Sequence, residues 1–376
     1  MQKAVFEKLD ATVSRLGFGA MRLPTLPDGS VDEAQTAQMV EYAISHGVNY
    51  FDTAYMYMGG ESERVMGRVL KKYPRDSFYL ADKMPLQMAK NEQDVKRIFQ
   101  DQLEKCQVDF FDFYLLHAMD RNRVAWMVDY KAYDFLCAMR REGKIRRLGF
   151  SFHDSAEVLD QILSRFEFDF VQVQLNYLDW TVQNARGVYQ VLEKHGVPGI
   201  VMEPVRGGFL ADPPKDAAAV LDEALPGKSY ASDALRWVAR LDGIKVILSG
   251  MSNMAQVIDN VNTFTNEPPM TDAQAAAVDR AAALIAQKKA IACTGCRYCE
   301  KCPKGIAIPE IFALYNRRKV FGEAFRVMQT YQTSIAPEHR ADACIGCGYC
   351  QSQCPQQLKI PELLKACHAE LITRGA

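Results

Sequence analysis

The strongest constraint on the fold is an alternation of short apolar runs with longer amphipathic segments between residues 14 and 265. Strand-like runs that alternate with helix-like segments indicate parallel strands joined by crossover helices. The expected strands are Leu16–Gly19, Asn49–Asp52, Phe78–Lys83, Phe111–His117, Arg147–Ser151, Phe170–Gln174, Gly199–Glu203 and Lys245–Ser249. Eight strand–helix units in about 250 residues are typical of an α/β protein with a (β/α)₈ TIM barrel.

A doubly wound open sheet is the competing fold. Such a sheet normally carries a glycine-rich dinucleotide loop after its first strand, and Gly17-Phe-Gly19-Ala-Met supplies two glycines but no third. A cluster of helix-breaking residues at 265–270 marks a domain boundary. We therefore predict a barrel over residues 1–268, a linker helix over 269–290 and a small domain over 291–376.

Composition narrows the classes of function. The 376-residue chain has 45 basic and 46 acidic residues, a formal net charge of −1. A nearly neutral chain has no bulk electrostatic reason to bind nucleic acid or an anionic membrane. No apolar run approaches the roughly 20 residues that cross a bilayer, and the N-terminus does not resemble a signal peptide. The expected location is the cytoplasm, and the expected partner is a small molecule.

Eight of the 11 cysteines lie in two short runs near the C-terminus. The runs are Cys293-Thr-Gly-Cys296-Arg-Tyr-Cys299-Glu-Lys-Cys302-Pro and Cys344-Ile-Gly-Cys347-Gly-Tyr-Cys350-Gln-Ser-Gln-Cys354-Pro. Three cysteines at every third position can wrap thiolates around one corner of a cubane. Zinc sites are the alternative, but they usually use two separated cysteine pairs.

Each run ends in a cysteine followed by proline and continues into Ile-Pro-Glu, and both features resemble the bacterial two-cluster ferredoxin module. The first run has one residue fewer before its last cysteine. The resemblance implies a C-terminal ferredoxin-like, largely helical domain with two [4Fe–4S] clusters. It also implies that each last cysteine crosses to the other cluster. The implied ligand sets are Cys293, Cys296, Cys299 and Cys354 for one cluster, and Cys344, Cys347, Cys350 and Cys302 for the other.

Polar residues follow three consecutive strands at their expected C-terminal ends, where barrel enzymes place catalysis. They are Asp52 with Tyr57, then Lys83, then His117. Such a set suits carbonyl reduction, because the oxygen that gains negative charge needs a proton donor. An ammonium near a phenol is expected to lower the phenol's pKa, and a carboxylate can hold that ammonium.

The segments Phe51-Asp-Thr-Ala-Tyr-Met-Tyr57, Glu61-Ser-Glu63 with Gly67, Lys83, and Leu116-His117 resemble the aldo-keto reductase pattern over about residues 1–265. Arg206-Gly-Gly208 resembles the subgroup that carries ferredoxin domains. The resemblance implies that Tyr57 is the proton donor and that Asp52, Lys83 and His117 complete a tetrad. Tyr55 is the rival phenol, but the family places the donor five residues after the aspartate.

The resemblance also implies that an extended nicotinamide cofactor, NAD(H) or NADP(H), crosses the barrel mouth. The matching positions are Gly19, Ala20, Met21, Asp52, Ser151, Gln172, Met202, Gly250, Met251, Ser252, Gln256 and Asn260. Met202 stands where the family usually stacks an aromatic ring, which leaves a bound flavin as an alternative. Gly250 and Gln256 replace the cations that usually clamp the 2′-phosphate, so NADH is expected to serve at least as well as NADPH.

Two functions follow. The favoured one is an oxidoreductase that interconverts a carbonyl and an alcohol on a small polar substrate. Its two clusters either carry electrons, with an external carrier as a further partner, or regulate it. The alternative is an iron–sulfur electron-transfer or redox-sensing protein whose barrel has no nicotinamide chemistry.

Overall fold

The computed structural model describes residues 1–6, 11–288, 290–321 and 324–373. Contacts within the chain divide it into two units. The barrel unit comprises Met1–Val205 and Ala231–Thr271, and the cysteine unit comprises Arg206–Tyr230 and Asp272–Ala376.

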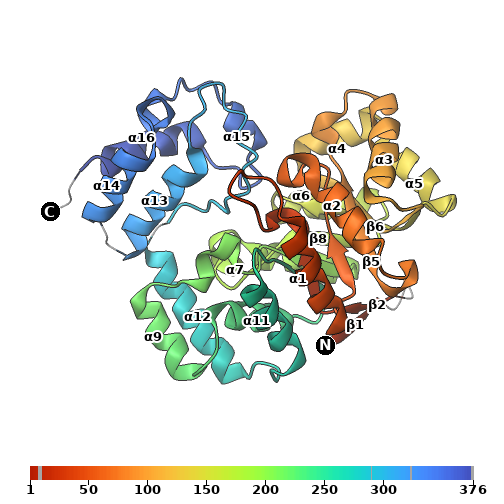
Figure 1. Cartoon of the computed structure of the whole chain (residues 1–376), viewed down its shortest axis with the longest axis horizontal. Coiled ribbons are helices and arrows are strands. Elements are labelled where there is room, and N and C mark those ends of the chain that lie inside the picture. Colours follow the sequence, from red (N-terminus) through yellow and green to blue (C-terminus); the bar gives the residue numbers. More distant parts are fainter. Residues whose placement is uncertain (7–10, 289, 322–323, 374–376) are drawn as a thin grey trace. The chain divides into compact units, whose positions relative to one another are not determined.

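The barrel unit contains a closed sheet of parallel strands in the order β10-β3-β4-β5-β6-β7-β8-β9 (Figure 1). The strands are β3 Leu16–Gly19, β4 Tyr50–Asp52, β5 Tyr79–Met84, β6 Phe111–Met119, β7 Ile145–Phe152, β8 Phe170–Gln174, β9 Gly199–Met202 and β10 Ile244–Gly250. Each lies on one of the predicted apolar runs, and the predicted (β/α)₈ barrel is confirmed.

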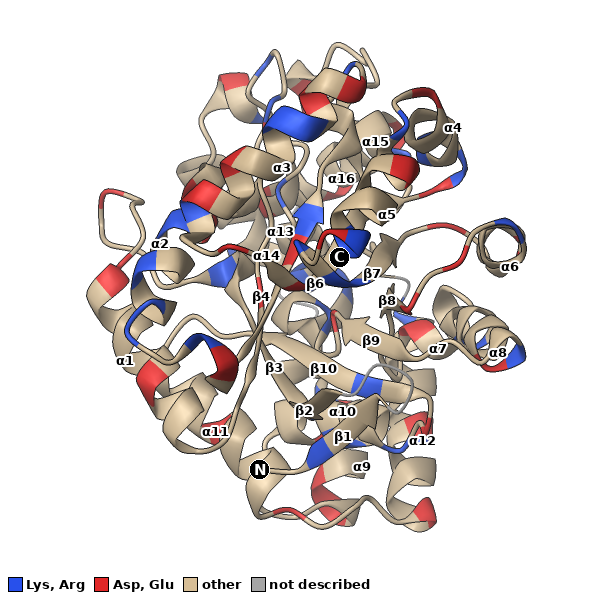
Figure 2. Cartoon of the chain, turned by 90° about the vertical axis from the view of Figure 1, so that its right-hand side faces the viewer, with Lys and Arg blue, Asp and Glu red and all other residues tan. Residues whose placement is uncertain are grey.

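Burial on both faces explains why the strands read as apolar runs rather than as an alternating pattern. All nine residues of β6 are buried, as are all four of β3. Gly17 has no room for a larger side chain, because a Cβ there would lie 2.7 Å from the side chains of Val246 and Leu248. Figure 2 shows charged residues mainly on the surrounding helices and loops, and the ribbons of β3 and β9 have none.

Some helices of the barrel unit begin where a polar side chain accepts hydrogen bonds from backbone N–H groups of the first turn. Asp32 accepts from the N–H of Gln35 at 2.9 Å, and Asn91 accepts from the N–H of Asp94 at 3.0 Å. The helices are α1 Glu33–Ser45, α2 Glu61–Leu70, α3 Glu92–Cys106, α4 Arg121–Asp129, α5 Ala132–Arg141, α6 Ala156–Arg165, α7 Asp179–Val182, α8 Ala185–His195, α10 Tyr230–Ala239 and α11 Met254–Thr265.

An antiparallel hairpin of β1 (Lys3–Phe6) and β2 (Ala11–Ser14) packs against the N-terminal ends of the barrel strands. Its Phe6 and Val13 share a buried cluster with Tyr50 and Phe113. The hairpin therefore fills the end of the barrel opposite the strand ends that carry the predicted site.

The cysteine unit is mostly helical. Its helices are α9 Lys215–Ala224, α12 Asp272–Gln287, α13 Ile308–Phe321, α14 Ala324–Ser334, α15 Tyr349–Gln353 and α16 Ile360–Leu371. Its core combines aliphatic and aromatic side chains such as Phe312, Tyr331 and Leu364 with the buried thiols of Cys299 and Cys350. Helix α12 lies within the predicted linker, of which residue 289 lies outside the described residues.

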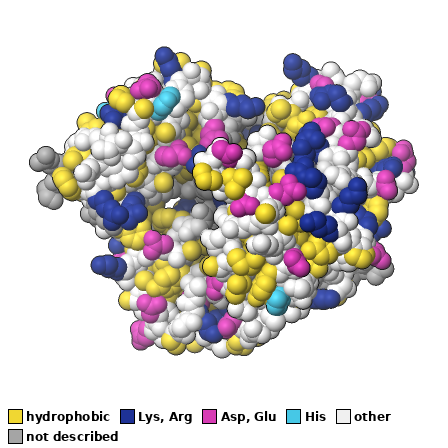
Figure 3. Space-filling view, viewed as in Figure 1, with side chains coloured by type: hydrophobic (Ala, Val, Ile, Leu, Met, Phe, Trp, Pro, Cys, Tyr) yellow, Lys and Arg dark blue, Asp and Glu magenta, His cyan; other side chains and the backbone are white. Residues whose placement is uncertain are grey.

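Surface charge agrees with the near-neutral composition. Figure 3 shows basic and acidic side chains interspersed over one face. In the part of the chain that the structure describes, no helix combines the length and the hydropathy that crossing a bilayer requires.

Candidate functional site

Four of the predicted site residues meet at the C-terminal ends of β4, β5 and β6. The Lys83 Nζ donates to Asp52 Oδ1 at 2.5 Å and to the Thr53 carbonyl oxygen at 2.7 Å. It also lies 4.8 Å from the centre of the Tyr57 ring. The rings of Tyr57 and His117 are 6.0 Å apart and nearly perpendicular, at 81°. The structure therefore brings a phenol, an ammonium, a carboxylate and an imidazole together in one buried site.

Tyr57 takes its place through the short helix η3 (Tyr57–Gly60) that follows β4. Met58, Gly59 and Gly60 all have positive φ, which folds the chain back toward α2. Tyr55, the rival phenol, points to a different neighbour: the Lys105 Nζ lies 3.9 Å from the centre of its ring. Of the two phenols, Tyr57 is the one that the structure places beside Lys83 and His117.

Burial dominates the protonation states of the site. It raises the pKa of Tyr57 well above its ordinary value, and the Asp52 carboxylate adds to that rise. This net direction is opposite to the lowered pKa expected from a nearby ammonium, because desolvation of the phenolate outweighs its attraction to cations. Burial, and then the Lys83 cation, lowers the pKa of His117 well below its ordinary value. At neutral pH the site holds a protonated phenol and a neutral imidazole.

The residues predicted to hold the nicotinamide amide lie on β7 and β8 of the same barrel. Ser151 and Gln172 are buried and face each other in register. The Ser151 Oγ accepts from the Ala118 N–H at 2.7 Å. The Gln172 Nε2 lies 3.6 Å from the Met202 Sδ, and its buried Oε1 has no hydrogen-bond partner among the described residues. An unpartnered carbonyl oxygen fits the amide N–H group of a nicotinamide.

The predicted nucleotide loop after β10 is already ordered by its own hydrogen bonds. The Ser252 N–H donates to Gln256 Oε1 at 2.7 Å, and the Ser252 Oγ donates to the Arg22 carbonyl oxygen at 2.8 Å. Asn260 is buried and donates to Ser249 Oγ at 2.9 Å. Gln256 and Asn260 therefore shape the loop. The remaining positions, Gly19, Ala20, Met21, Gly250 and Met251, lie at the ends of β3 and β10, which pair with each other.

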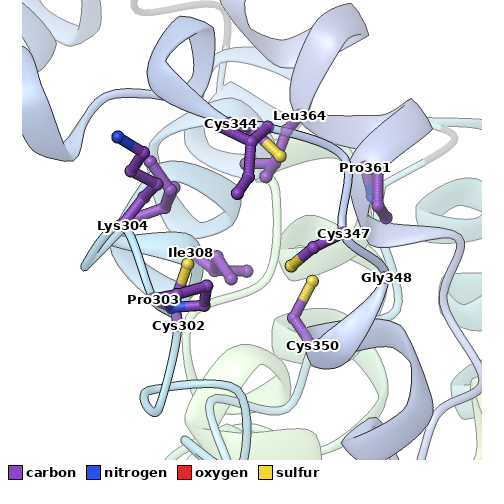
Figure 4. A pocket seen from close by; sticks show the side chains of 12 residues that line it. Cys302, Pro303, Lys304, Ile308, Cys344, Cys347, Gly348, Cys350, Pro361 and Leu364 are labelled. Atoms are coloured by element: carbon purple, nitrogen blue, oxygen red, sulfur yellow. The ribbon is translucent and has the colours of Figure 1, made fainter.

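The eight predicted cluster cysteines line two hollows in the cysteine unit. Figure 4 shows Cys302, Cys344, Cys347 and Cys350 around the first hollow, with Lys304, Ile308 and Leu364. The second hollow is lined by Cys293, Cys296, Cys299 and Cys354. Each last cysteine thus lies with the three cysteines of the other run, in the arrangement that the ferredoxin resemblance implies.

The two runs share a local conformation. Gly295 and Gly346 occupy the same position in each run, and both have positive φ, 65° and 69°. A Cβ at either would meet nothing within 4 Å, so glycine is needed there for its backbone conformation.

The donor set fits a cluster. Burial and the neighbouring thiols raise the pKa of Cys299 to about 12 and that of Cys350 to about 11, so grouped thiolates need a cationic centre. Within the described ranges no three His, Cys, Asp or Glu side chains are spaced to hold a single ion.

Comparison with known proteins identifies the family of the barrel. The model of the aldo/keto reductase family matches residues 15–283. The chain belongs to the aldo/keto reductase family. This aldo/keto reductase also matches the model of a 4Fe-4S dicluster domain over residues 292–360. The predicted family, with its C-terminal iron–sulfur domain, is confirmed, and the chain is an oxidoreductase.

Relatives of this aldo/keto reductase match about two thirds to three quarters of the chain. L-galactose dehydrogenase of Arabidopsis thaliana is 28% identical over 67% of this chain and 85% of its own length. The NADH-specific methylglyoxal reductase of Escherichia coli is 24% identical over 66% of this chain and 78% of its own. A solved aldo-keto reductase from Bacillus halodurans, in its holo form, is 26% identical with a TM-score of 0.63. It covers 75% of this chain and 96% of that one.

Two features of this aldo/keto reductase were missed by reasoning from the sequence. One is an ion pair of 3.0 Å between Arg22, after β3, and Glu203, after β9. The other is a buried group of polar residues behind Lys83 that includes Glu63 and Asp82. A carboxylate inside an apolar strand, as at Asp82, is the signal that could have pointed to the second.

Proposed function

We propose that this protein reduces a carbonyl group on a small polar substrate to an alcohol, with a nicotinamide cofactor, and catalyses the reverse oxidation. The observation that carries the proposal is the buried contact of Lys83 with Asp52 beside the Tyr57 and His117 rings. The Tyr57 hydroxyl donates a proton to the carbonyl oxygen, and the neutral His117 orients that oxygen.

Each remaining member of the tetrad has one physical role. The Lys83 ammonium stabilises the phenolate that Tyr57 becomes after donating its proton. Asp52 and the Thr53 carbonyl hold that ammonium in place. When bound, a nicotinamide supplies the hydride. The unpartnered Gln172 Oε1, with Ser151 and Met202, would hold its carboxamide end at the strand ends.

The decisive experiment is Tyr57→Phe, which removes the hydroxyl and keeps the ring. We expect carbonyl reduction to fall by about 10²–10⁴-fold, while NADH still binds when titrated by fluorescence. The matched control is Tyr55→Phe, which should stay within about twofold of the wild type. If Tyr57→Phe were active and Tyr55→Phe inactive, Tyr57 would not be the donor.

Cofactor preference follows from the loop after β10. Gly250 and Gln256 offer no cation to a 2′-phosphate, and Gln256 is engaged with the Ser252 N–H. We therefore expect kcat/KM with NADH to equal or exceed that with NADPH, because neither of these two positions supplies a charge-assisted partner for the phosphate. The methylglyoxal reductase of Escherichia coli, to which the chain is similar, carries the words NADH-specific in its name, and this supports the expected preference for NADH. A strong preference for NADPH in paired steady-state kinetics would contradict it.

We also propose that the two hollows of the cysteine unit hold [4Fe–4S] clusters, with Cys302 and Cys354 each joined to the three cysteines of the other run. The clusters pass electrons to or from an external carrier, or they sense the redox state. An iron–sulfur protein without nicotinamide chemistry remains the second candidate. Iron content, followed by turnover of a panel of carbonyls with NADH and NADPH, distinguishes the two.

A further inference from the structure

A group of polar side chains fills the space between β5 and helices α2 and α3, on the face of β5 opposite the Lys83 side chain. Its members are Asp82 on β5, Glu63 on α2, Gln102 on α3 and Tyr114 on β6. All four are fully buried. Successive side chains of a strand point to opposite faces, so Asp82 lies behind the strand while Lys83 faces the site.

Side chains of this group bind both main-chain polar groups of Lys83. The Lys83 N–H donates to Asp82 Oδ1 at 2.8 Å, and Gln102 Nε2 donates to the Lys83 carbonyl oxygen at 3.0 Å. Both polar atoms of the Gln102 side-chain amide form further hydrogen bonds. Its Nε2 also donates to Glu63 Oε1 at 2.9 Å, and its Oε1 accepts from the Tyr114 hydroxyl.

The charge balance of the group depends on one shared proton. Burial, and then the Glu63 carboxylate, raises the pKa of Asp82 well above its ordinary value, so Asp82 is protonated and donates to Glu63. On α3, the Lys105 Nζ lies 3.4 Å from Glu63 Oε2, and the Cys106 thiol lies 3.6 Å from Asp82 Oδ2. The Glu63 carboxylate is thus paired with the Lys105 ammonium, and no second buried anion opposes it.

We propose that Asp82, Glu63 and Gln102 are positioning residues that hold the main chain of Lys83, so that its ammonium meets Asp52 and faces the Tyr57 ring. This inference rests on the proposed function, which gives Lys83 its role toward Tyr57. The reason such a clamp matters is geometric: a catalytic group misplaced by about 1 Å can cost about 10²-fold in rate. A buried lysine on a strand end stays in register only while its backbone partners are satisfied.

The first test compares Gln102→Leu with Gln100→Leu. Gln102→Leu removes the amide that links Lys83 to Glu63 and keeps a side chain of similar size. We expect kcat to fall by about 10- to 100-fold, with little change in the KM for NADH. Gln100 lies on the same helix, is exposed and bonds only Glu104 Oε1 in the described hydrogen bonds, so Gln100→Leu should match the wild type.

The pH profile separates positioning from simple loss of stability. The rate of reduction falls at high pH when Tyr57 loses its proton. A displaced Lys83 ammonium stabilises the phenolate less, so Gln102→Leu should move this fall to higher pH. A variant that is less stable but has an unchanged profile and unchanged kcat would overturn the proposal.

The second test uses Asp82→Asn and Asp82→Leu. An asparagine keeps an oxygen that accepts from the Lys83 N–H and an N–H that donates to Glu63, as protonated aspartic acid does. We expect Asp82→Asn to retain most of kcat and Asp82→Leu to lose it as Gln102→Leu does. Equal losses in both Asp82 variants would show that the charge of Asp82, rather than its place in the clamp, is what matters, and would refute the proposal.

Hydrogen exchange gives a measurement that needs no turnover. The β5 peptide Tyr79–Met84 should exchange faster in Gln102→Leu and Asp82→Leu than in Asp82→Asn or Gln100→Leu. If the wild type turned over no carbonyl while this exchange pattern held, the proposed function would have failed and the clamp would stand. If turnover were present and exchange at β5 were unchanged in all variants, the clamp would have failed alone.

Discussion

At the scale of single residues, burial keeps two titratable groups of the barrel in their neutral form. It raises the pKa of Asp82 and lowers the pKa of His117. Each neutral group makes folding depend on pH, because the unfolded chain titrates at ordinary values. For a carboxyl group with a raised pKa, stability is lost as pH rises from its unfolded value toward its folded value.

The raised pKa of Asp82 predicts how Asp82→Asn changes the thermal stability of the protein with pH. Below about pH 3 the aspartic acid is mostly protonated in both states of the wild type, so the difference in unfolding temperature between the variant and the wild type should not change with pH there. As pH rises from there toward 8, Asp82 ionises in the unfolded wild type before it does in the folded protein, which favours unfolding of the wild type. We expect the thermal midpoint of Asp82→Asn to rise above that of the wild type across this range.

Asp94→Asn is the matched control, with the opposite sign. Asp94 is half-buried, and hydrogen bonds from the Lys90 N–H and Arg97 lower its pKa. Ionised Asp94 stabilises the folded protein at pH values above the pKa that this residue has in the unfolded chain. Asp94→Asn should therefore lose stability, relative to the wild type, as pH rises. Thermal midpoints of Asp82→Asn, Asp94→Asn and the wild type, measured by differential scanning calorimetry at several pH values, check both predictions. A constant offset between Asp82→Asn and the wild type would contradict the neutral Asp82.

At the scale of elements, the two cysteine runs are related copies that depend on each other. Each run supplies three cysteines to one hollow and one to the other, so neither hollow is formed by one run alone. The helices that follow, α13 and α16, both begin with Ile-Pro-Glu and pack together in one core with the buried cysteines. Helix packing and ligation are therefore coupled.

Cys302→Ala tests this exchange between the runs. We expect the variant to lose or damage the cluster of Cys344, Cys347 and Cys350 and to retain the cluster of its own run, because Cys302 lies in the other hollow. Iron content and electron paramagnetic resonance of the reduced protein show which cluster is lost and which is retained. Cys367→Ala, which removes a buried thiol outside both hollows, should keep both clusters. Loss confined to the cluster of Cys293, Cys296 and Cys299 would refute the assignment.

At the scale of the whole molecule, the proposed function would put two kinds of electron chemistry in one chain. A hydride carries two electrons together, whereas a [4Fe–4S] cluster passes one at a time. One-electron forms of nicotinamide are very unfavourable, so the two domains cannot exchange electrons directly without a converter. A flavin is the usual converter.

We therefore expect that NADH alone does not bleach the clusters of flavin-free protein at a rate comparable with turnover. Anaerobic stopped-flow absorbance measures the bleaching, after flavin content has been assayed in the same sample. Dithionite is the control, because it should bleach the clusters and show that they are reducible. Fast bleaching by NADH in protein without flavin would contradict the expectation.

The sequence alone determined the barrel and the location of its site. Each strand is a continuous apolar run because parallel strands are buried on both faces, and this signal is local. Asp52, Lys83 and His117 could be found because the C-terminal ends of barrel strands meet at one mouth. The cysteine spacing likewise identified the second domain, since three of the four cysteines around each hollow follow one another closely in the sequence.

Only the tertiary structure decided which distant groups meet. Glu63, Asp82 and Gln102 come from three separate elements, and the clamp on Lys83 exists only when those elements pack. The segment Arg206–Tyr230 groups with the cysteine unit because the backbone at Gly207 packs directly against Thr294, a contact across 87 residues of sequence. The direction of the Tyr57 pKa also required the structure, because burial depends on the whole fold and outweighs the charges near in sequence.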